Sequence, residues 1–133
     1  MLTDLVIFAT DHGKPIYLQL AEWLEKEILS GNIAADERIY SQYQLAEMFN
    51  INPATAARGL NILVDEEILY KKRGLGMFLS PGAVAMIKKR RRKQNLERLV
   101  RELVEEARLL NISRAELGEL IRGAHRGEKG EKQ

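Results

Sequence analysis

The chain has 133 residues, of which 45% are hydrophobic and 30% are charged, and it contains no cysteine. This length predicts one small globular domain with an appendage, or two intertwined small units. The absence of cysteine excludes disulfides, thiolate catalysis and cysteine-ligated zinc. No apolar run approaches the roughly 20 residues that a membrane-spanning helix needs, and the N-terminus lacks the features of a secretory leader. The sequence therefore predicts a cytoplasmic protein that does not enter a membrane.

Charge is distributed unevenly along the chain. Residues 1–80 carry 7 basic and 11 acidic side chains, whereas residues 81–133 carry 14 basic and 8 acidic ones. The acidic first part has no bulk attraction for a polyanion. An interpretation that involves nucleic acid must therefore rest on the positions of individual cations.

The first part of the chain predicts an arm followed by helices. Residues 1–14 predict an extended arm and a loop, a first helix covers residues 15–30, and a second covers residues 42–49 behind the N-cap Ser41. The first helix has one apolar side, formed by Ile16, Leu20, Trp23, Leu24 and Ile28. This stripe indicates a helix that packs against a core, with the tryptophan as a packing residue.

A third helix is predicted from Asn52 to Val64, with Asn52 as N-cap and Pro53 at the first helical position. Asn50 suits the left-handed conformation of a tight turn between the second and third helices. The core face of the third helix is predicted to hold Ala56, Leu60, Leu63 and Val64, and the opposite face Ala54, Thr55, Arg58 and, more marginally, Asn61. A small, polar and basic face suits a DNA major groove, although an ordinary solvent-facing surface has the same composition.

Residues 68–72 and 77–80 predict two strands, joined by a glycine-containing turn at residues 73–76. The only basic cluster of the acidic part falls at the tip of this hairpin and consists of Lys71, Lys72 and Arg73. Helix, turn, helix and hairpin together predict a mostly α fold with a small β-wing, the winged helix-turn-helix. The acidic triplet at residues 65–67 lies at the end of the third helix and is interpreted as solvated surface, not as a metal site.

The last third of the chain predicts a long helix from Ala83 to about Leu110, roughly 42 Å in length. A break at residues 111–113 and a capping box on Ser113 introduce a last helix that ends near Arg122. Two amphipathic helices without a third partner predict a two-fold homodimer, and the alternative folds them back on the first domain. The apolar face assigned to the dimer consists of Leu96, Leu99, Val100, Leu103, Val104, Ala107, Leu110, Leu117, Leu120 and Ile121.

The predicted organisation thus has three parts. Residues 1–80 form the arm and the winged domain, residues 81–124 a two-helix dimerisation module, and residues 125–133 a disordered tail. The run of six cations at residues 88–93 has two open interpretations, contact with DNA phosphates or a solvated helix segment.

Residues 15–79 resemble the winged-helix DNA-binding domain of the GntR family of bacterial transcription regulators. The matching motifs are Pro15-Ile16-Tyr17-Leu18-Gln19, Ser41 with Leu45-Ala46-Glu47, Asn52-Pro53-x-Thr55-x-x-Arg58, and Arg73-Gly74-x-Gly76-x-Phe78. The Asn-Pro-x-Thr motif, with only two short helices after the wing, is similar to the YtrA-type branch. This resemblance implies a homodimer that binds an inverted-repeat operator on double-stranded DNA, usually as a repressor and often beside genes for an ABC transporter.

By motif position, the resemblance places the DNA-binding residues in three segments. They are Ser41 and Tyr43 on the positioning helix, Asn52, Thr55 and Arg58 on the recognition helix, and Arg73, Gly74 and Gly76 in the wing, where Lys71 and Lys72 join them from the residue analysis. The chain departs from the family pattern at Tyr43, where a common DNA-contacting arginine is missing, and at Glu67, where glycine is usual.

A second function remains open, a helical scaffold whose winged domain binds protein. An enzyme is not expected, because two isolated histidines and no positioned nucleophile and base leave no residue with a catalytic role. No cofactor and no metal is expected. A small-molecule effector is compatible with the sequence but unidentified, and it would need a crevice between subunits or beside the wing.

Overall fold

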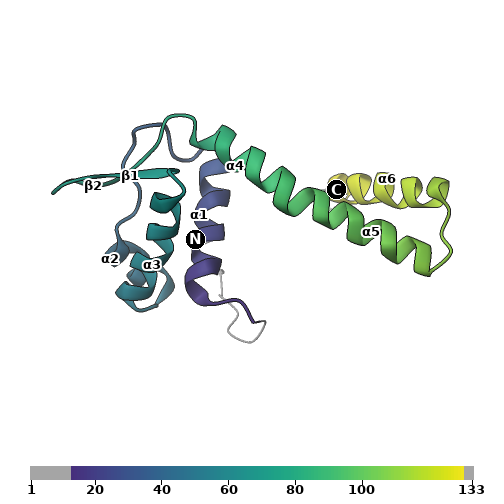
Figure 1. Cartoon of the computed structure of the whole chain (residues 1–133), viewed down its shortest axis with the longest axis horizontal. Helices are drawn as coiled ribbons and strands as arrows, with labels where there is room; N and C mark the ends of the chain where they lie inside the picture. Colours follow the sequence, from purple (N-terminus) through teal and green to yellow (C-terminus); the bar gives the residue numbers. More distant parts are fainter. Residues whose placement is uncertain (1–12, 131–133) are drawn as a thin grey trace. The chain divides into compact units, whose positions relative to one another are not determined.

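The computed structural model of the chain describes residues 13–130 (Figure 1). The predicted N-terminal arm therefore lies largely outside the described residues. The chain divides into two compact units, Met1–Lys89 and Arg90–Gln133. Among residues 13–130, no helix combines the length and apolar character needed to cross a bilayer.

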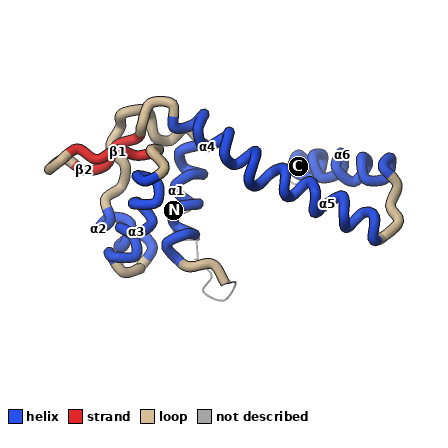
Figure 2. The backbone as a smooth tube through the Cα atoms, in the orientation of Figure 1, coloured by secondary structure: helices blue, strands red, loops and turns tan. Residues whose placement is uncertain are grey.

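The first unit contains the predicted helices and hairpin. The order is α1 (Ile16–Leu29), α2 (Gln42–Phe49), α3 (Pro53–Asp65), β1 (Leu69–Lys72), β2 (Gly76–Leu79) and the start of α4 (Ala83–Arg91) (Figure 2). These bounds confirm the predicted mostly helical fold with a small β-wing.

Local hydrogen bonds explain the boundaries of α2 and α3. The Ser41 hydroxyl accepts a hydrogen bond from the backbone N–H of Gln44 at 3.1 Å, and the Gln44 side chain accepts one from the N–H of Ser41 at 2.7 Å. This capping box starts α2. Asn50 ends α2 in the left-handed conformation with φ of 54°. The side chain of Asn52 then accepts from the N–H of Ala54 at 2.7 Å and starts α3, as the sequence predicted.

The core of the first unit lies between α1, α2, α3 and the base of the wing. Its fully buried side chains come from all of these elements, namely Leu20, Leu24, Ile28, Leu45, Leu60, Leu63, Ile68, Leu69 and Leu79. Trp23 packs edge-on against Phe49 with ring centroids 4.8 Å apart, so it is a packing residue. Ala83 and Ile87 at the start of α4 are also buried in this core. The first unit consequently extends to Lys89, past the boundary predicted at residue 80.

The wing is an antiparallel pair in which Leu69 lies opposite Leu79 and Lys72 lies opposite Gly76. The connector before α2 adds a third extended segment to this pair. The N–H of Asp36 donates to the carbonyl of Leu79 at 2.7 Å, the N–H of Leu79 donates to the carbonyl of Glu37 at 2.9 Å, and further along Arg38 bridges Phe78. A hairpin alone is marginally stable, and the added segment fixes it to the domain.

The second unit departs from the predicted single helix. After α4 come a π-helical segment, Arg92–Leu96, and then α5, Glu97–Leu109. The N–H of Glu97 donates to the carbonyl of Arg92, five residues back, which is the π-helical pattern. Residues 88–95 contain no apolar side chain, so the sequence periodicity there carries no information on the phase of the helix.

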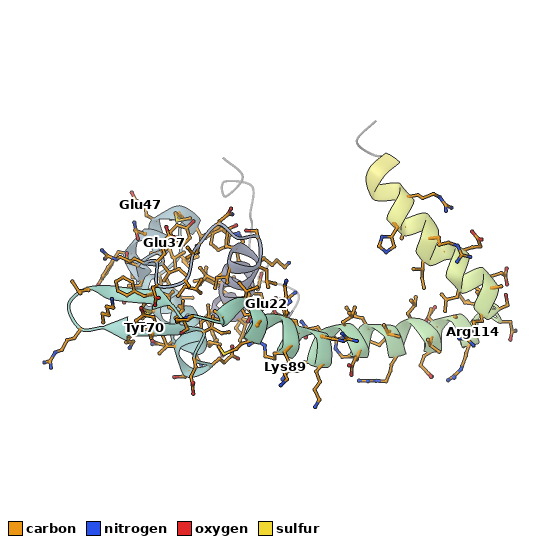
Figure 3. All side chains as sticks on the ribbon, turned by 90° about the horizontal axis from the view of Figure 1, so that it is seen from above. Glu22, Glu37, Glu47, Tyr70, Lys89 and Arg114 are labelled. Atoms are coloured by element: carbon orange, nitrogen blue, oxygen red, sulfur yellow. The ribbon has the colours of Figure 1, made fainter. Side chains whose placement is uncertain are left out.

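The last helix, α6, runs from Arg114 to Gly130, so the predicted end near Arg122 and the disordered tail from residue 125 are wrong as far as residue 130. The predicted capping box is present, because the hydroxyl of Ser113 accepts from the N–H of Glu116 at 3.1 Å. Once this nucleus exists, each further residue adds a hydrogen bond, and a single glycine weakens a helix by only about 1 kcal/mol. Figure 3 shows α6 leaving the end of α5 at a steep angle.

The end of α3 carries a strained residue. Glu67 has φ of 64°, in the left-handed region. The N–H of Ile68 donates to the carbonyl of Leu63 at 2.9 Å, and the N–H of Glu67 donates to the carbonyl of Val64 at 2.9 Å. This pair of bonds is a Schellman motif, which normally has glycine at the left-handed position. The structure thus gives the physical reason for the glycine that the family pattern has here.

Replacing Glu67 by glycine should stabilise the first unit, because glycine adopts the left-handed conformation without a Cβ clash. We expect a gain of about 1 kcal/mol in the free energy of unfolding, measured by thermal or urea denaturation followed by circular dichroism. Glu66→Gly is the matched control, since Glu66 has φ of −86° and gains nothing from glycine. Equal effects of the two substitutions would contradict the strain at Glu67.

Candidate nucleic-acid interface

Helix α3 presents two faces with different chemistry. Ala56, Gly59, Leu60 and Leu63 are buried against the rest of the first unit. The opposite side exposes Ala54, Arg58 and Asn61, with Thr55 half-buried beside them. The predicted recognition face therefore exists as one continuous surface of small, polar and basic side chains. Such a surface lets a helix backbone approach base edges closely.

The Arg58 side chain has a defined neighbour. Its guanidinium carbon lies 3.9 Å from the centre of the Tyr17 ring, on the first turn of α1. The two helices approach closely at the next residue, because a Cβ at Gly59 would lie only 2.9 Å from the carbonyl oxygen of Tyr17 and 3.2 Å from a methyl carbon of Leu20. Sequence analysis did not identify this contact, since spacing along one helix cannot show which residue of another helix faces it.

The two predicted DNA-binding residues that also cap helices keep only part of their hydrogen-bonding capacity. The hydroxyl oxygen of Ser41 and the side-chain oxygen of Asn52 both accept backbone bonds at helix starts. A capping hydroxyl still has a proton to donate, and a capping amide still has its NH₂ group. Tyr43, on the first turn of α2, is 69% exposed and is available as a surface side chain.

The three wing cations do not form one surface. Side chains alternate along a strand, so Lys71 and Lys72 point to opposite faces of the hairpin. The Lys72 ammonium lies 4.6 Å from the centre of the Phe78 ring, whereas Arg73 lies exposed at the turn. The turn is closed by the N–H of Leu75, which donates to the carbonyl of Lys72 at 2.8 Å.

A further cation, Arg38, lies beside the wing and was not singled out by sequence analysis. A Cβ at Gly76 would lie 2.9 Å from Nε of Arg38, so the guanidinium covers that glycine. Gly76 and Gly74 have positive φ values of 115° and 77°, which glycine adopts without a Cβ clash, so both suit the predicted turn. Nothing in the sequence distinguishes an isolated arginine in a connector, and only the pairing of residues 36–39 with β2 brings it here.

The wing is also anchored by side chains. The hydroxyl of Tyr70 donates a hydrogen bond to a carboxylate oxygen of Asp36 at 2.7 Å. This bond raises the pKa of the Tyr70 hydroxyl above its usual value of 10.0, and desolvation and the negative charge of Asp36 act in the same direction. The ring of Tyr70 stacks on that of Phe78 with centroids 5.9 Å apart. The anchor joins the connector to β1 on the side of the sheet that carries Lys72.

The cation run at residues 88–93 and the acidic residues at the end of α3 do not gather into a compact site. In the cation run, Lys88, Lys89, Arg92 and Lys93 are exposed, whereas Arg90 and Arg91 are half-buried. The acidic residues at the end of α3 are exposed. In the described part of the chain, no group of three or more histidine or acidic side chains is placed to hold a metal ion.

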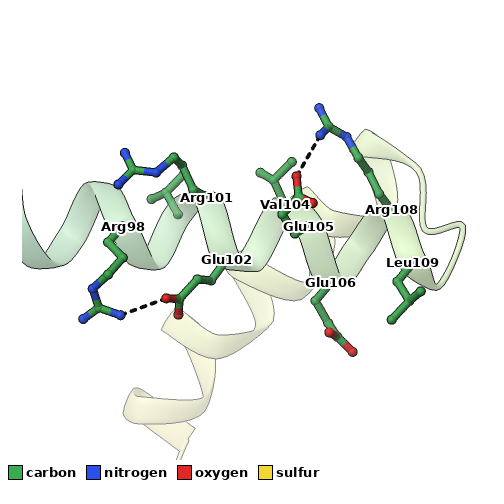
Figure 4. A pocket seen from close by; sticks show the side chains of 9 residues that line it. Arg98, Arg101, Glu102, Val104, Glu105, Glu106, Arg108 and Leu109 are labelled. Atoms are coloured by element: carbon green, nitrogen blue, oxygen red, sulfur yellow. Dashed lines mark hydrogen bonds and ion pairs between the residues drawn. The ribbon is translucent and has the colours of Figure 1, made fainter.

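In the second unit, most of the apolar residues assigned to a dimer are solvent-exposed within the single chain. Leu99 and Val100 are each 50% exposed and Leu103 is 42% exposed, whereas Ala107 is buried. A groove of about 900 Å³ runs along α5, with Val100, Val104 and Leu109 among its lining residues (Figure 4). Two ion pairs, Arg98–Glu102 and Arg108–Glu105, each 3.0 Å long, border it. The other exposed members of the predicted face are Leu96, Leu110, Leu120 and Ile121, and Leu117 is half-buried.

These features define a class of protein, the winged helix-turn-helix proteins. The model of the family described as bacterial regulatory proteins, gntR family, matches residues 16–79. A solved transcriptional regulator assigned to the GntR family, from Bacteroides thetaiotaomicron, is 30% identical, with a TM-score of 0.71 over 86% of this chain and 99% of that one. The chain belongs to the GntR family.

Two further relatives match the first unit. The HTH-type transcriptional repressor NagR of Bacillus subtilis (strain 168) is 38% identical over 66 residues, which are 50% of this chain and 27% of NagR. The chain thus spans about a quarter of the length of that relative. The DNA-binding domain of AraR, solved in complex with the operator ORX1, is 26% identical, with a TM-score of 0.50 over 54% of this chain and 87% of that one.

The Tyr70 anchor should make the stability of the wing depend on pH. The pKa of Tyr70 is higher in the folded state than in the unfolded state. The contribution of its hydrogen bond to folding stability is therefore complete below pH 10 and is lost as the pH rises through the folded-state pKa. We expect Tyr70→Phe to unfold at a lower temperature than the unsubstituted protein at pH 8, with the difference shrinking above pH 10. Thermal unfolding at both pH values measures it, and a difference that stays constant with pH would contradict the role of the hydroxyl proton.

Proposed function

We propose that the protein is a sequence-specific DNA-binding transcription regulator, a repressor that acts as a homodimer on an inverted-repeat operator. The observation that carries this proposal is the outward face of α3, where Ala54, Thr55 and Arg58 form a small, polar and basic surface on a helix capped by Asn52. Transcriptional repressors among the relatives and an AraR domain solved with its operator support it. The proposal includes no enzymatic step.

On this proposal, α3 enters the major groove and the wing contacts the phosphate backbone. Short side chains at positions 54 and 55 let the helix approach, and the planar guanidinium of Arg58 offers two parallel donors to a guanine edge or a phosphate. Contacts that set the register on the duplex come from Lys71, Lys72 and Arg73, together with Ser41 at the N-cap of α2 and Tyr43 on its first turn. Gly74 and Gly76 allow the turn that carries the cations.

Self-association is proposed from the exposed apolar side of α5 and α6. The leucines at positions 99, 103 and 110 are about half exposed. They gain from a second apolar surface, because burying the exposed half of each is worth roughly 1 kcal/mol, about half the value for complete burial. A second copy offers the same surface by two-fold symmetry.

The finer parts of the proposal follow from the family resemblance. They are membership of the YtrA-type branch, a dimerisation module that consists of α5 and α6, and an operator near transporter genes. A small effector, where one exists, would enter between subunits or beside the wing, where a groove of about 490 Å³ is lined by Val64, Tyr70 and Met86 among others.

Replacing Arg58 by alanine should abolish the preference for the operator while the protein remains a dimer. Loss of one bidentate contact is worth about 1–3 kcal/mol of discrimination, or roughly 5- to 150-fold in affinity ratio. Gel shifts compare the duplex upstream of the protein's own gene with a scrambled duplex, and light scattering reports the oligomeric state. Arg114→Ala, at the exposed start of α6, is the matched control. Unchanged selectivity of the Arg58 variant would overturn the assignment of α3.

Replacing Leu103 by glutamate should dissociate the dimer, because it places a charge in the middle of an apolar interface. We expect light scattering to show monomers at micromolar concentration. We also expect the variant to lose the gain in affinity that a dimer has on a duplex with two half-sites, compared with a duplex that carries one half-site. Arg101→Gln, on the other side of α5, is the control and should leave the dimer intact. A Leu103 variant that stays dimeric at every concentration would exclude this face.

A further inference from the structure

We propose that Tyr17 is a positioning residue for Arg58, which holds the guanidinium in the orientation that reads DNA. This inference rests on the proposed function and adds a residue of α1 to a site otherwise built from α2, α3 and the wing. Its basis is the stack in which the guanidinium carbon lies 3.9 Å from the centre of the Tyr17 ring. A separation of less than about 6 Å is the range in which cation–π attraction acts.

The stack leaves the hydrogen-bonding edge of the arginine free. A guanidinium is planar, and its five N–H groups lie in that plane. A ring placed over one face of the guanidinium therefore covers none of these donors, and Arg58 is exposed to solvent on α3. Arginine is the residue that combines aromatic stacking with bidentate donation.

The geometry of the stack is fixed by the backbones beneath it. Gly59 allows α1 and α3 to approach until its missing Cβ would lie 2.9 Å from the Tyr17 carbonyl oxygen. Tyr17 is half-buried, and the next turn of α1 places Leu20 fully in the core. The ring therefore belongs to the rigid part of the domain, whereas an arginine without it would sample many rotamers. Ordering that side chain before DNA arrives lowers the entropy lost on binding.

The test is a double-mutant cycle measured on DNA. The probes are a labelled duplex from upstream of the protein's own gene and a scrambled duplex of the same composition, at low salt so that weak variants remain measurable. We expect Tyr17→Leu to lower affinity for the upstream duplex about fivefold, the size of an exposed cation–π contact. Tyr17→Phe, which keeps the ring, should bind within twofold of the unsubstituted protein. In an Arg58→Ala background, Tyr17→Leu should have no further effect.

A control separates positioning from packing. Ile16→Ala removes apolar volume from the same turn of α1 and keeps the ring, so it should lower the unfolding temperature and leave affinity within twofold. The inference is overturned if Tyr17→Leu leaves affinity unchanged, if its loss is equal in the Arg58→Ala background, or if Ile16→Ala reproduces it. A protein without preference between the two duplexes before any substitution would instead overturn the proposed function, and the positioning role with it.

Discussion

The close approach of α1 and α3 at Gly59 is the constraint on which the first unit depends. Alanine at this position would favour an isolated helix, but its Cβ would meet backbone of α1 at 2.9 Å, and backbone cannot move aside as a side chain can. The tertiary demand therefore overrides the helical propensity. With the helices at this distance, Leu20, Leu60 and Leu63 are closed off from solvent, and the opposite side of α3 is left facing outward.

Much of the first unit could be predicted from the sequence because its signals are local. The caps at Ser41 and Asn52, the left-handed Asn50 and the glycines of the wing each act over a few residues, and the structure confirms all of them. The family assignment followed from the order of the same signals. The core faces of α1 and α3 could also be predicted from the sequence, because helical periodicity alone separates buried from exposed positions.

The parts that could not be predicted involve contacts between distant segments or stretches without periodicity. Tyr17 and Arg38 reach the candidate site only through packing of α1 on α3 and pairing of the connector with β2. Lys71, Lys72 and Arg73 form one cluster in the sequence, yet the alternation of side chains along β1 puts Lys71 and Lys72 on opposite faces of the hairpin. The π-helical turn lies in a stretch of charged and polar residues, where no apolar pattern records the helical phase. The tail was misjudged because composition alone says little about a helix that is already nucleated at Ser113.

The exposed carboxylates at the C-terminal end of α3 make the charge along this helix asymmetric. Its cation sits in the middle, its acids lie at the end nearest the wing, and the negative end of the helix dipole coincides with them. On the proposed function, an approach to the duplex that turns this end toward the phosphates would be repelled, and the opposite approach would not. The same acids weaken indiscriminate adhesion to the vast excess of unrelated sequence in a genome. On the proposed function, such a protein would search DNA by short encounters and stay bound where specific contacts outweigh the repulsion.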